Sequence, residues 1–375
     1  MKGRIGVALV VLAGAAALAG TALPSCWSLS DPLLDPGPDG GTGGAAGGGT
    51  GGSGASGGGG NAPCVPVHPP KAPDAGSTTT AGGWTFAIRA VRFEADPGET
   101  LGFDLDDHCT CPDPPSCIAD VVGDAGADAG THCDGPGGTD NTLGPALEEA
   151  VNYATHTAAE RFTEGAEAGL WTLLIQLDES TVPDDPQVQI EALAGAACCG
   201  GNEPSWDGSD PWPTVADTNP ATAAEAYLVG QVLVARFDLL EVPMRGDGMR
   251  LTIRMHDVVL SATLDTSPPI ARLVDGAIVG EVTEDDLFTG LSSIEVDLTG
   301  TTYRLCMGND DFYTGAKEAV CNARDLPAGD VGSSCERASI ALGFTADEVG
   351  AGGTASIPAL GTCPDGTDPI QDQCD

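Results

Sequence analysis

The sequence predicts a mainly β domain, an antiparallel β-sandwich-like fold that is rich in disulfides and carries one attached α-helix. Three observations lead to this fold class. Apolar runs of strand length outnumber helical patterns and do not alternate regularly with them, which favours an antiparallel sheet over an α/β fold. Thirteen cysteines occur in 375 residues, which is typical of an exported, disulfide-bonded chain. Only one long segment has a clear helical period.

The strand predictions rest on alternating apolar side chains. In residues 84–95 the apolar positions alternate and then shift near Ala90, which predicts a strand with a β-bulge. Asp275-Gly276 stands between two apolar runs and predicts a hairpin turn. The remaining strand candidates are residues 170–177, 187–193, 227–237, 250–264, 270–274, 277–282 and 338–344.

The one convincing helical pattern covers residues 145–165. Its apolar side chains recur at three- and four-residue steps along one face. Pro145 suits the first turn, and Asn141 or Thr142 can cap the helix. Two shorter helices are expected at residues 284–294 and 311–323.

Residues 1–25 have the composition of a lipoprotein-type signal peptide. Basic residues precede the apolar stretch 5–19, which is too short for a stable membrane span. The segment Leu23-Pro24-Ser25-Cys26 resembles a bacterial lipobox, in which the cysteine is lipidated and becomes the mature N-terminus. Ordinary cleavage after Ala17-Leu18-Ala19 is the alternative.

Counting cysteines favours lipidation at Cys26. Of the thirteen, twelve then remain, and an even number can pair completely in an oxidising compartment. The pairing itself stays open. A local disulfide between Cys363 and Cys374 is the simplest expectation there, and Cys198 and Cys199 are expected to have separate partners because a bond between neighbours is strained. The predicted disulfide cysteines are Cys64, Cys109, Cys111, Cys117, Cys133, Cys198, Cys199, Cys306, Cys321, Cys335, Cys363 and Cys374.

Residues 26–83 are predicted to be a flexible, low-complexity tether. The tract 36–60 is Gly-rich and residues 61–83 are rich in Pro and Thr, and neither has an apolar period from which a core could form. As a random coil, the Gly-rich tract would span about 28 Å, enough to hold a domain clear of a membrane surface. A single disulfide-stapled β-rich domain is expected at residues 84–375.

The net charge restricts the possible partners. The chain has 15 basic and 55 acidic residues and a formal charge of −40. Nucleic acid is excluded as a partner because affinity for phosphates comes mainly from Lys and Arg. An anionic membrane surface is disfavoured for the same reason, so membrane attachment is expected through the N-terminal lipid. The acidity itself is typical of a solvated surface.

Two acidic clusters stand beside cysteines between Leu101 and Asn141. A disulfide joining the two regions would bring their acids together, and carboxylate and amide oxygens suit Ca²⁺. The EF-hand spacing fails, since Cys109 and Pro145 replace the required Gly and Glu. Turn formation by Asp and Gly is the alternative. The candidate metal ligands are Asp104, Asp106, Asp107, Asp134, Asp140 and Asn141.

Zinc is a second metal hypothesis for the same region. It would use sulfur and imidazole ligands, but only one short cysteine pair approaches the spacing of a structural site, and export favours disulfides over free thiolates. The residues concerned are Cys109, Cys111, Cys117, Cys133, His108 and His132.

A weaker candidate for ligand binding lies in the loop of residues 200–220. Trp206 and Trp212 stand there beside the acids Asp207 and Asp210, a combination typical of sugar-binding surfaces. The alternative is that both rings pack the loop onto the sheet.

Motifs of common enzyme classes are absent from the sequence. There is no H-E-x-x-H or Walker A pattern. His256 and Asp257 are adjacent in a predicted strand and would point to opposite faces. A glycosidase needs only two carboxylates at a suitable separation, so a secreted hydrolase that acts on glycans through an unidentified Asp/Glu pair stays open as an alternative.

Two resemblances complete the sequence interpretation. The phrases DLDD and DGPGGTDN look like the Asp-rich loops of thrombospondin type-3 and dockerin modules, which bind calcium. The lipobox, the Gly-rich tether, GFDLDDHCTC, CDGPGGTDN and the late ASIALGF together resemble uncharacterised secreted Cys-rich lipoproteins of myxobacteria. This second resemblance implies a place in the cell envelope, at the outer membrane or cell surface. The leading expectation is a non-enzymatic, lipid-anchored binding or structural protein stabilised by Ca²⁺, with a surface glycan or protein as its ligand.

Overall fold

The computed structural model describes residues 65–96, 99–111, 115–118, 132–151, 157–216, 218–246, 248–267, 269–298 and 301–374. The predictions for the signal peptide, the Gly-rich tract, Cys26 and Cys64 lie outside the described residues. Within the described ranges, no helix combines the length and the apolar character needed to cross a membrane.

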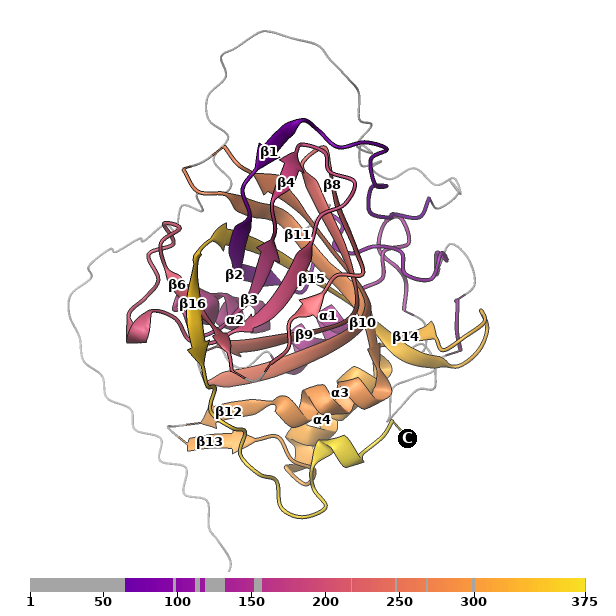
Figure 1. Cartoon of the computed structure of the whole chain (residues 1–375). Coiled ribbons are helices and arrows are strands. Elements are labelled where there is room, and N and C mark those ends of the chain that lie inside the picture. The colour runs from indigo at the N-terminus through magenta and orange to yellow at the C-terminus, as the bar shows by residue number, and fades with distance from the viewer. Residues whose placement is uncertain are drawn as a thin grey trace, which may run out of the picture. The chain divides into compact units, whose positions relative to one another are not determined.

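The prediction of a mainly β fold is confirmed. Figure 1 shows a large curled sheet with helices beneath one end. Its neighbours are antiparallel except for β6 and β16, the one parallel strand pair among the described strands. The strands are β1 (Thr79–Ala81), β2 (Trp84–Arg92), β3 (Thr172–Leu177), β4 (Ser180–Val182), β5 (Ile190–Gly195), β6 (Pro211–Val215), β7 (Ala221–Thr222), β8 (Glu225–Val229), β9 (Val232–Gly246), β10 (Met249–Asp265), β11 (Arg272–Thr283), β12 (Glu295–Leu298), β13 (Thr301–Arg304), β14 (Arg324–Pro327), β15 (Cys335–Glu348) and β16 (Gly350–Ala355).

The sheet curls until strands from its two halves face each other. Its central order is β10-β11-β15-β2-β3-β5, with β9 and β8 continuing beyond β10. Leu228 of β8 and Asp185 exchange two backbone hydrogen bonds, and the N–H of Val188 donates to the carbonyl of Ala226. These bonds join β8 to the segment that leads into β5, so the apolar face is enclosed between two layers, as the sandwich-like prediction requires.

Alternation along the strands divides the core. In β3, Leu173 and Ile175 face the interior with Phe86, whereas Leu174 packs on the opposite face with Trp212. Successive side chains of a strand point to opposite faces, so both faces of β3 are buried. This explains why three apolar residues, Leu173, Leu174 and Ile175, follow one another in β3.

The folded part begins earlier than Trp84. β1 pairs with β4 in a small antiparallel sheet, although the sequence assigned residues 61–83 to the tether. The N–H of Val67 donates to the carbonyl of Gly137, and the N–H of Asp104 donates to the carbonyl of Val67. Backbone bonds therefore order this Pro-rich stretch without an apolar period.

The long helical pattern corresponds to two helices, α1 (Leu143–Val151) and α2 (Ala158–Glu167). Thr157 and Glu160 form a capping box that begins α2. A second helix therefore begins within the apolar stripe that the sequence predicted as one helix. The Glu148 carboxylate accepts bonds from the N–H groups of Ala158 and Ala159 and holds this start against α1. The predicted shorter helices are confirmed as α3 (Glu284–Ser293) and α4 (Asp310–Asn322).

The Asp275-Gly276 hairpin prediction is wrong, because β11 runs straight through both residues. Asp275 has φ of 50°, and the pairing of β11 with β15 shifts between Leu273 and Gly276. A Cβ on Gly276 would lie 2.6 Å from the Phe344 ring. The glycine is therefore needed for close packing within a bulge. The bulge predicted near Ala90 is confirmed by a register shift between β2 and β15.

Five disulfides join described cysteines. Cys111–Cys133 connects the two acidic regions, a pairing that the sequence had left open. Two pairing expectations are wrong: Cys198 bonds directly to Cys199, and Cys363 and Cys374 do not bond to each other. Both reach back to the chain around α4 instead, which the sequence could not show. The other pairs are Cys117–Cys335, Cys306–Cys363 and Cys321–Cys374, and Cys109 is also disulfide-bonded.

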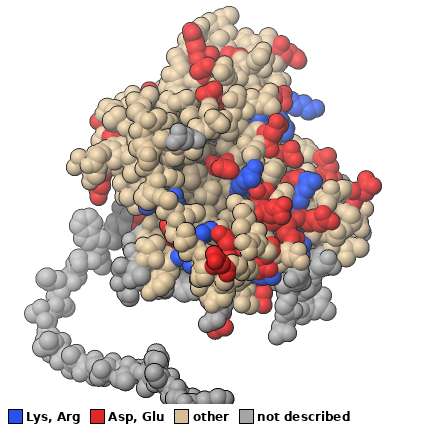
Figure 2. Space-filling view, turned by 60° about the horizontal axis from the view of Figure 1, so that its bottom comes forward, with Lys and Arg blue, Asp and Glu red and all other residues tan. Residues whose placement is uncertain are grey.

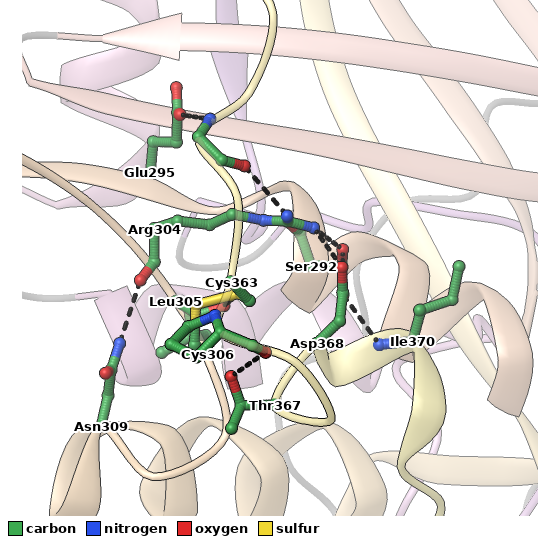
Figure 3. Close-up of a disulfide and its surroundings, with 12 residues drawn as sticks. Ser292, Glu295, Arg304, Leu305, Cys306, Asn309, Cys363, Thr367, Asp368 and Ile370 are labelled. Atoms are coloured by element: carbon green, nitrogen blue, oxygen red, sulfur yellow. Dashed lines mark hydrogen bonds and ion pairs between the residues drawn. A yellow bond between two sulfur atoms is a disulfide. The ribbon is translucent and has the colours of Figure 1, made fainter.

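The C-terminal segment is fastened by ion pairs as well as disulfides. Figure 3 shows the Arg304 side chain beside the Cys306–Cys363 bond. The Arg304 guanidinium donates to the carbonyl of Gly361 at 3.0 Å and to the Asp368 carboxylate at 2.9 Å. The tail thus packs against α3 and β13 and does not extend as a free acidic end.

Removing the Cys321–Cys374 disulfide should destabilise the domain strongly. The bond spans 53 residues, and loop closure of that length constrains the unfolded chain by about 4 kcal/mol. We expect Cys321→Ala/Cys374→Ala to lower the free energy of unfolding by about that amount in urea titrations.

The matched control is Cys198→Ala/Cys199→Ala, because a bond between adjacent residues closes almost no loop. A control loss as large as that of the long-range pair would contradict this account.

Candidate metal site

Three carboxylates converge where the two acidic regions meet. Asp104, Asp106 and Asp140 each offer an oxygen, and these ligand atoms lie within 4.8 Å of one another. Asp104 and Asp140 are buried, with 5% and 2% exposure, and Asp106 is half-buried. The predicted metal region is therefore confirmed in its coarser form, as a group that could hold a metal ion.

Asn141 fixes this group to the sheet. Its Nδ2 donates to the carbonyl of Phe93 at 2.8 Å, and its Oδ1 accepts from the N–H of Ala341 at 2.9 Å. The preceding N–H, of Asp140, donates to the carbonyl of Phe103 at 3.0 Å. Asn141 thus positions Asp140 through hydrogen bonds made by both of its polar side-chain atoms.

One oxygen of the group lacks a partner. Asp104 Oδ1 accepts from the N–H of His108 at 3.2 Å, whereas Oδ2 is buried and accepts no hydrogen bond. A Cβ on Gly138, which has φ of 71°, would lie 2.5 Å from Oδ2. Only glycine permits this approach. A buried carboxylate oxygen without a donor is unfavourable, and a cation would satisfy it.

Burial, with a smaller contribution from neighbouring carboxylates, raises the pKa values of this group. Burial, reinforced by the charges of Asp325, Asp106 and Asp134, raises the pKa of Asp140 to about 9. Burial is also the main cause for Asp134, with a pKa of about 6, and for Asp325, with a pKa of about 7. The pKa of Asp104 is raised by burial and by Asp106. Each shift therefore favours the protonated carboxyl in a desolvated space.

Asp325 was missed by sequence reasoning. It lies on β14, far along the chain from the acidic loops, and accepts from the N–H and Oγ of Ser339 at 2.8 and 2.6 Å. No cysteine or turn motif marks it. Only the pairing of β14 with β15 brings it to Asp134 and Asp140.

The other predicted ligands have different roles. Asp107 lies on the surface and pairs with His68 at 3.3 Å. Asp134 accepts from the N–H of Thr110 at 2.6 Å and stands beside the three-carboxylate group. The zinc hypothesis is wrong, because the four cysteines it needs are all disulfide-bonded and supply no thiolate.

The predicted tryptophan surface is a packing feature. Trp212 is 1% exposed and donates to the carbonyl of Ala196 at 2.9 Å. Buried Asp210 accepts from the N–H of Trp206 at 2.7 Å and so shapes the loop. The Trp206 ring faces Arg89, at 5.4 Å. Asp207 is exposed and bonds to Ser209. Trp212 and Asp210 are therefore buried residues that pack the loop, whereas Trp206 is half-buried and Asp207 is exposed.

His256 does have an acidic partner, but it is Asp286 and not Asp257. His256 Nε2 lies 2.8 Å from Asp286 Oδ2, at the start of α3. Thr283 Oγ1 donates to the same oxygen, and Arg254 lies 3.5 Å from the other. This carboxylate stabilises the N-terminus of α3, whose cap is Thr283.

Comparison with models of known families, with curated proteins and with solved structures gave no match. The function must therefore be argued from the three-carboxylate group itself.

Without a bound cation, the protein should lose stability between about pH 4 and pH 9. Asp titrates near 3.9 in an unfolded chain, whereas the pKa values of Asp134, Asp325 and Asp140 are raised to about 6, 7 and 9. The folded state binds more protons in this window, so stability falls as the pH rises.

Calorimetry in metal-depleted buffer should show this fall in Tm and a smaller fall for Asp140→Asn. The control Asp107→Asn removes one exposed charge from the same region and should keep the wild-type slope. An Asp140→Asn slope equal to wild type would refute the assignment.

Proposed function

We propose that this chain is an exported, lipid-anchored cell-envelope protein of non-enzymatic binding or structural type, in which Ca²⁺ holds the acidic loops together. The observation that carries the proposal is the buried, unpartnered Oδ2 of Asp104 within the three-carboxylate group. Such an oxygen is stable beside a cation and unfavourable without one.

The donor chemistry favours Ca²⁺ over softer metals. The group consists of carboxylate oxygens, which are hard ligands, and the neighbouring sulfurs are held in disulfides. Ca²⁺ accepts six to eight oxygens in flexible geometry, so it tolerates ligands from two separate loops. An ion here would link Asp104 and Asp106 to Asp140, and its effect would be to stabilise their relative position.

The cellular location is argued from the sequence. The export signal, the lipobox-like Cys26 and the resemblance to secreted myxobacterial lipoproteins support an envelope location. Figure 2 shows acidic side chains spread over the visible face, consistent with a formal charge of −40 and a solvated surface without affinity for nucleic acid.

Ca²⁺ should raise the thermal stability, and Asp104 should be required for that effect. A ligand at a hundred times its Kd contributes about 2.7 kcal/mol, which corresponds to a rise in Tm of about 4 °C for a domain of roughly 300 residues. Calorimetry of the mature chain in Ca²⁺ and in EGTA measures it.

Asp104→Asn should lose most of this shift while its Tm in EGTA stays equal to wild type or exceeds it, because a buried charge is removed. A residue with only a packing role would instead lower Tm in EGTA. Asp107→Asn is the matched control and should keep the full shift. No Ca²⁺ effect on the wild type would refute the metal proposal.

Cys26→Ser should release the protein from membranes. The substitution removes the thiol that would carry the lipid and leaves the apolar signal in place. Detergent-phase partitioning of expressed protein should move from the detergent phase to the aqueous phase. If the variant partitions like the wild type, the lipid anchor is wrong.

A further inference from the structure

A cavity of about 220 Å³ adjoins the three-carboxylate group. The cavity is lined by Ala95, residues 99–101, 133–136 and 139–142, and Asp325. Asp140 belongs to both the cavity wall and the carboxylate group, so an ion held by that group lies next to the cavity. The volume is below the roughly 300–1,000 Å³ of pockets for drug-sized ligands and suits a single small ring.

The lining is rich in hydrogen-bond acceptors. Glu99, Asp134, Asp140 and Asp325 contribute carboxyl groups, and none of the described lining residues is Lys or Arg. Asp134 and Asp325 are held in place by bonds from Thr110 and Ser339. A wall of this kind repels anions and accepts hydrogen bonds from hydroxyl groups.

The three carboxylates leave part of the coordination of Ca²⁺ to other ligands. One oxygen of each already accepts a backbone N–H: Asp104 Oδ1 and Asp106 Oδ1 from His108, and Asp140 Oδ2 from Leu105. Ca²⁺ needs six to eight oxygens, so further oxygens must come from water or a ligand. The cavity beside Asp140 is where such a ligand has room.

We propose that this cavity binds one ring of a neutral glycan, whose adjacent hydroxyl groups complete the coordination of the Ca²⁺ ion and donate hydrogen bonds to Asp134 and Asp325. The proposal rests on the Ca²⁺ site proposed above. Neighbouring ring hydroxyls provide the two required features, because each is an oxygen ligand and a hydrogen-bond donor at once.

Saturation-transfer NMR on the mature chain tests this with the methyl pyranosides of mannose, galactose, glucose and fucose, and with glucuronate as the anionic probe. We expect at least one neutral sugar to bind in Ca²⁺ and none in EGTA, with no binding of glucuronate. Thr100 is exposed and lines the cavity, so Thr100→Trp should fill the cavity and weaken sugar binding by about tenfold or more. Its rise in Tm with Ca²⁺ should stay that of wild type.

Thr354→Trp is the matched control, because Thr354 is an exposed threonine on β16 outside the cavity lining, and it should bind sugar as wild type does. If Ca²⁺ raises Tm but no neutral sugar binds, the glycan inference is wrong and the Ca²⁺ proposal survives. Sugar binding that persists in EGTA or in Thr100→Trp overturns the inference. Release of nitrophenol from nitrophenyl glycosides would overturn it in favour of hydrolysis.

Discussion

The side-chain amide of Asn141 is bonded on one side to Phe93, just after β2, and on the other to Ala341 in β15. These bonds span two neighbouring strands and hold Asp140 against the sheet. The Cys111–Cys133 disulfide then ties the loop that carries Asp104 and Asp106 to the same region. The Asn141 hydrogen bonds and the disulfide hold the acids of the group close together. They do so although carboxylates do not attract one another.

The fold therefore brings like charges together and compensates them only in part. Backbone N–H groups reach Asp106, Asp134 and Asp140, but hydrogen bonds from neutral donors do not cancel several charges in a desolvated space. Asp140, with a pKa raised to about 9, and the unpartnered Oδ2 of Asp104 have the same origin. A proton relieves the charge of Asp140 at neutral pH, and a divalent cation would relieve both features.

Local chemistry made part of the site predictable. The loops of Asp104 and Asp140 both carry cysteines, and the sequence indicated that a disulfide between the loops would bring their acids together, although it left the pairing open. Asp325 was not predictable, because only strand pairing brings it to the site. Burial explains two further differences between the prediction and the structure. Trp212 was a candidate surface residue beside acids but packs inside. The Phe344 ring requires a glycine at the position where Asp275-Gly276 suggested a turn. In each case a contact distant in sequence overrode a local pattern.

The gathering of carboxylates around the proposed Ca²⁺ ion favours glycan binding over glycan hydrolysis. A glycosidase of this kind would need a carboxyl group that keeps its proton near neutral pH to act as general acid, and the raised pKa values of Asp134 and Asp325 fit that role only without a cation. A Ca²⁺ ion beside Asp140 would favour the ionised form of these neighbouring carboxyl groups. The ion that stabilises the loops would therefore remove the proton a general acid requires, and it would leave a cavity lined by acceptors, which is suited to holding hydroxyl groups.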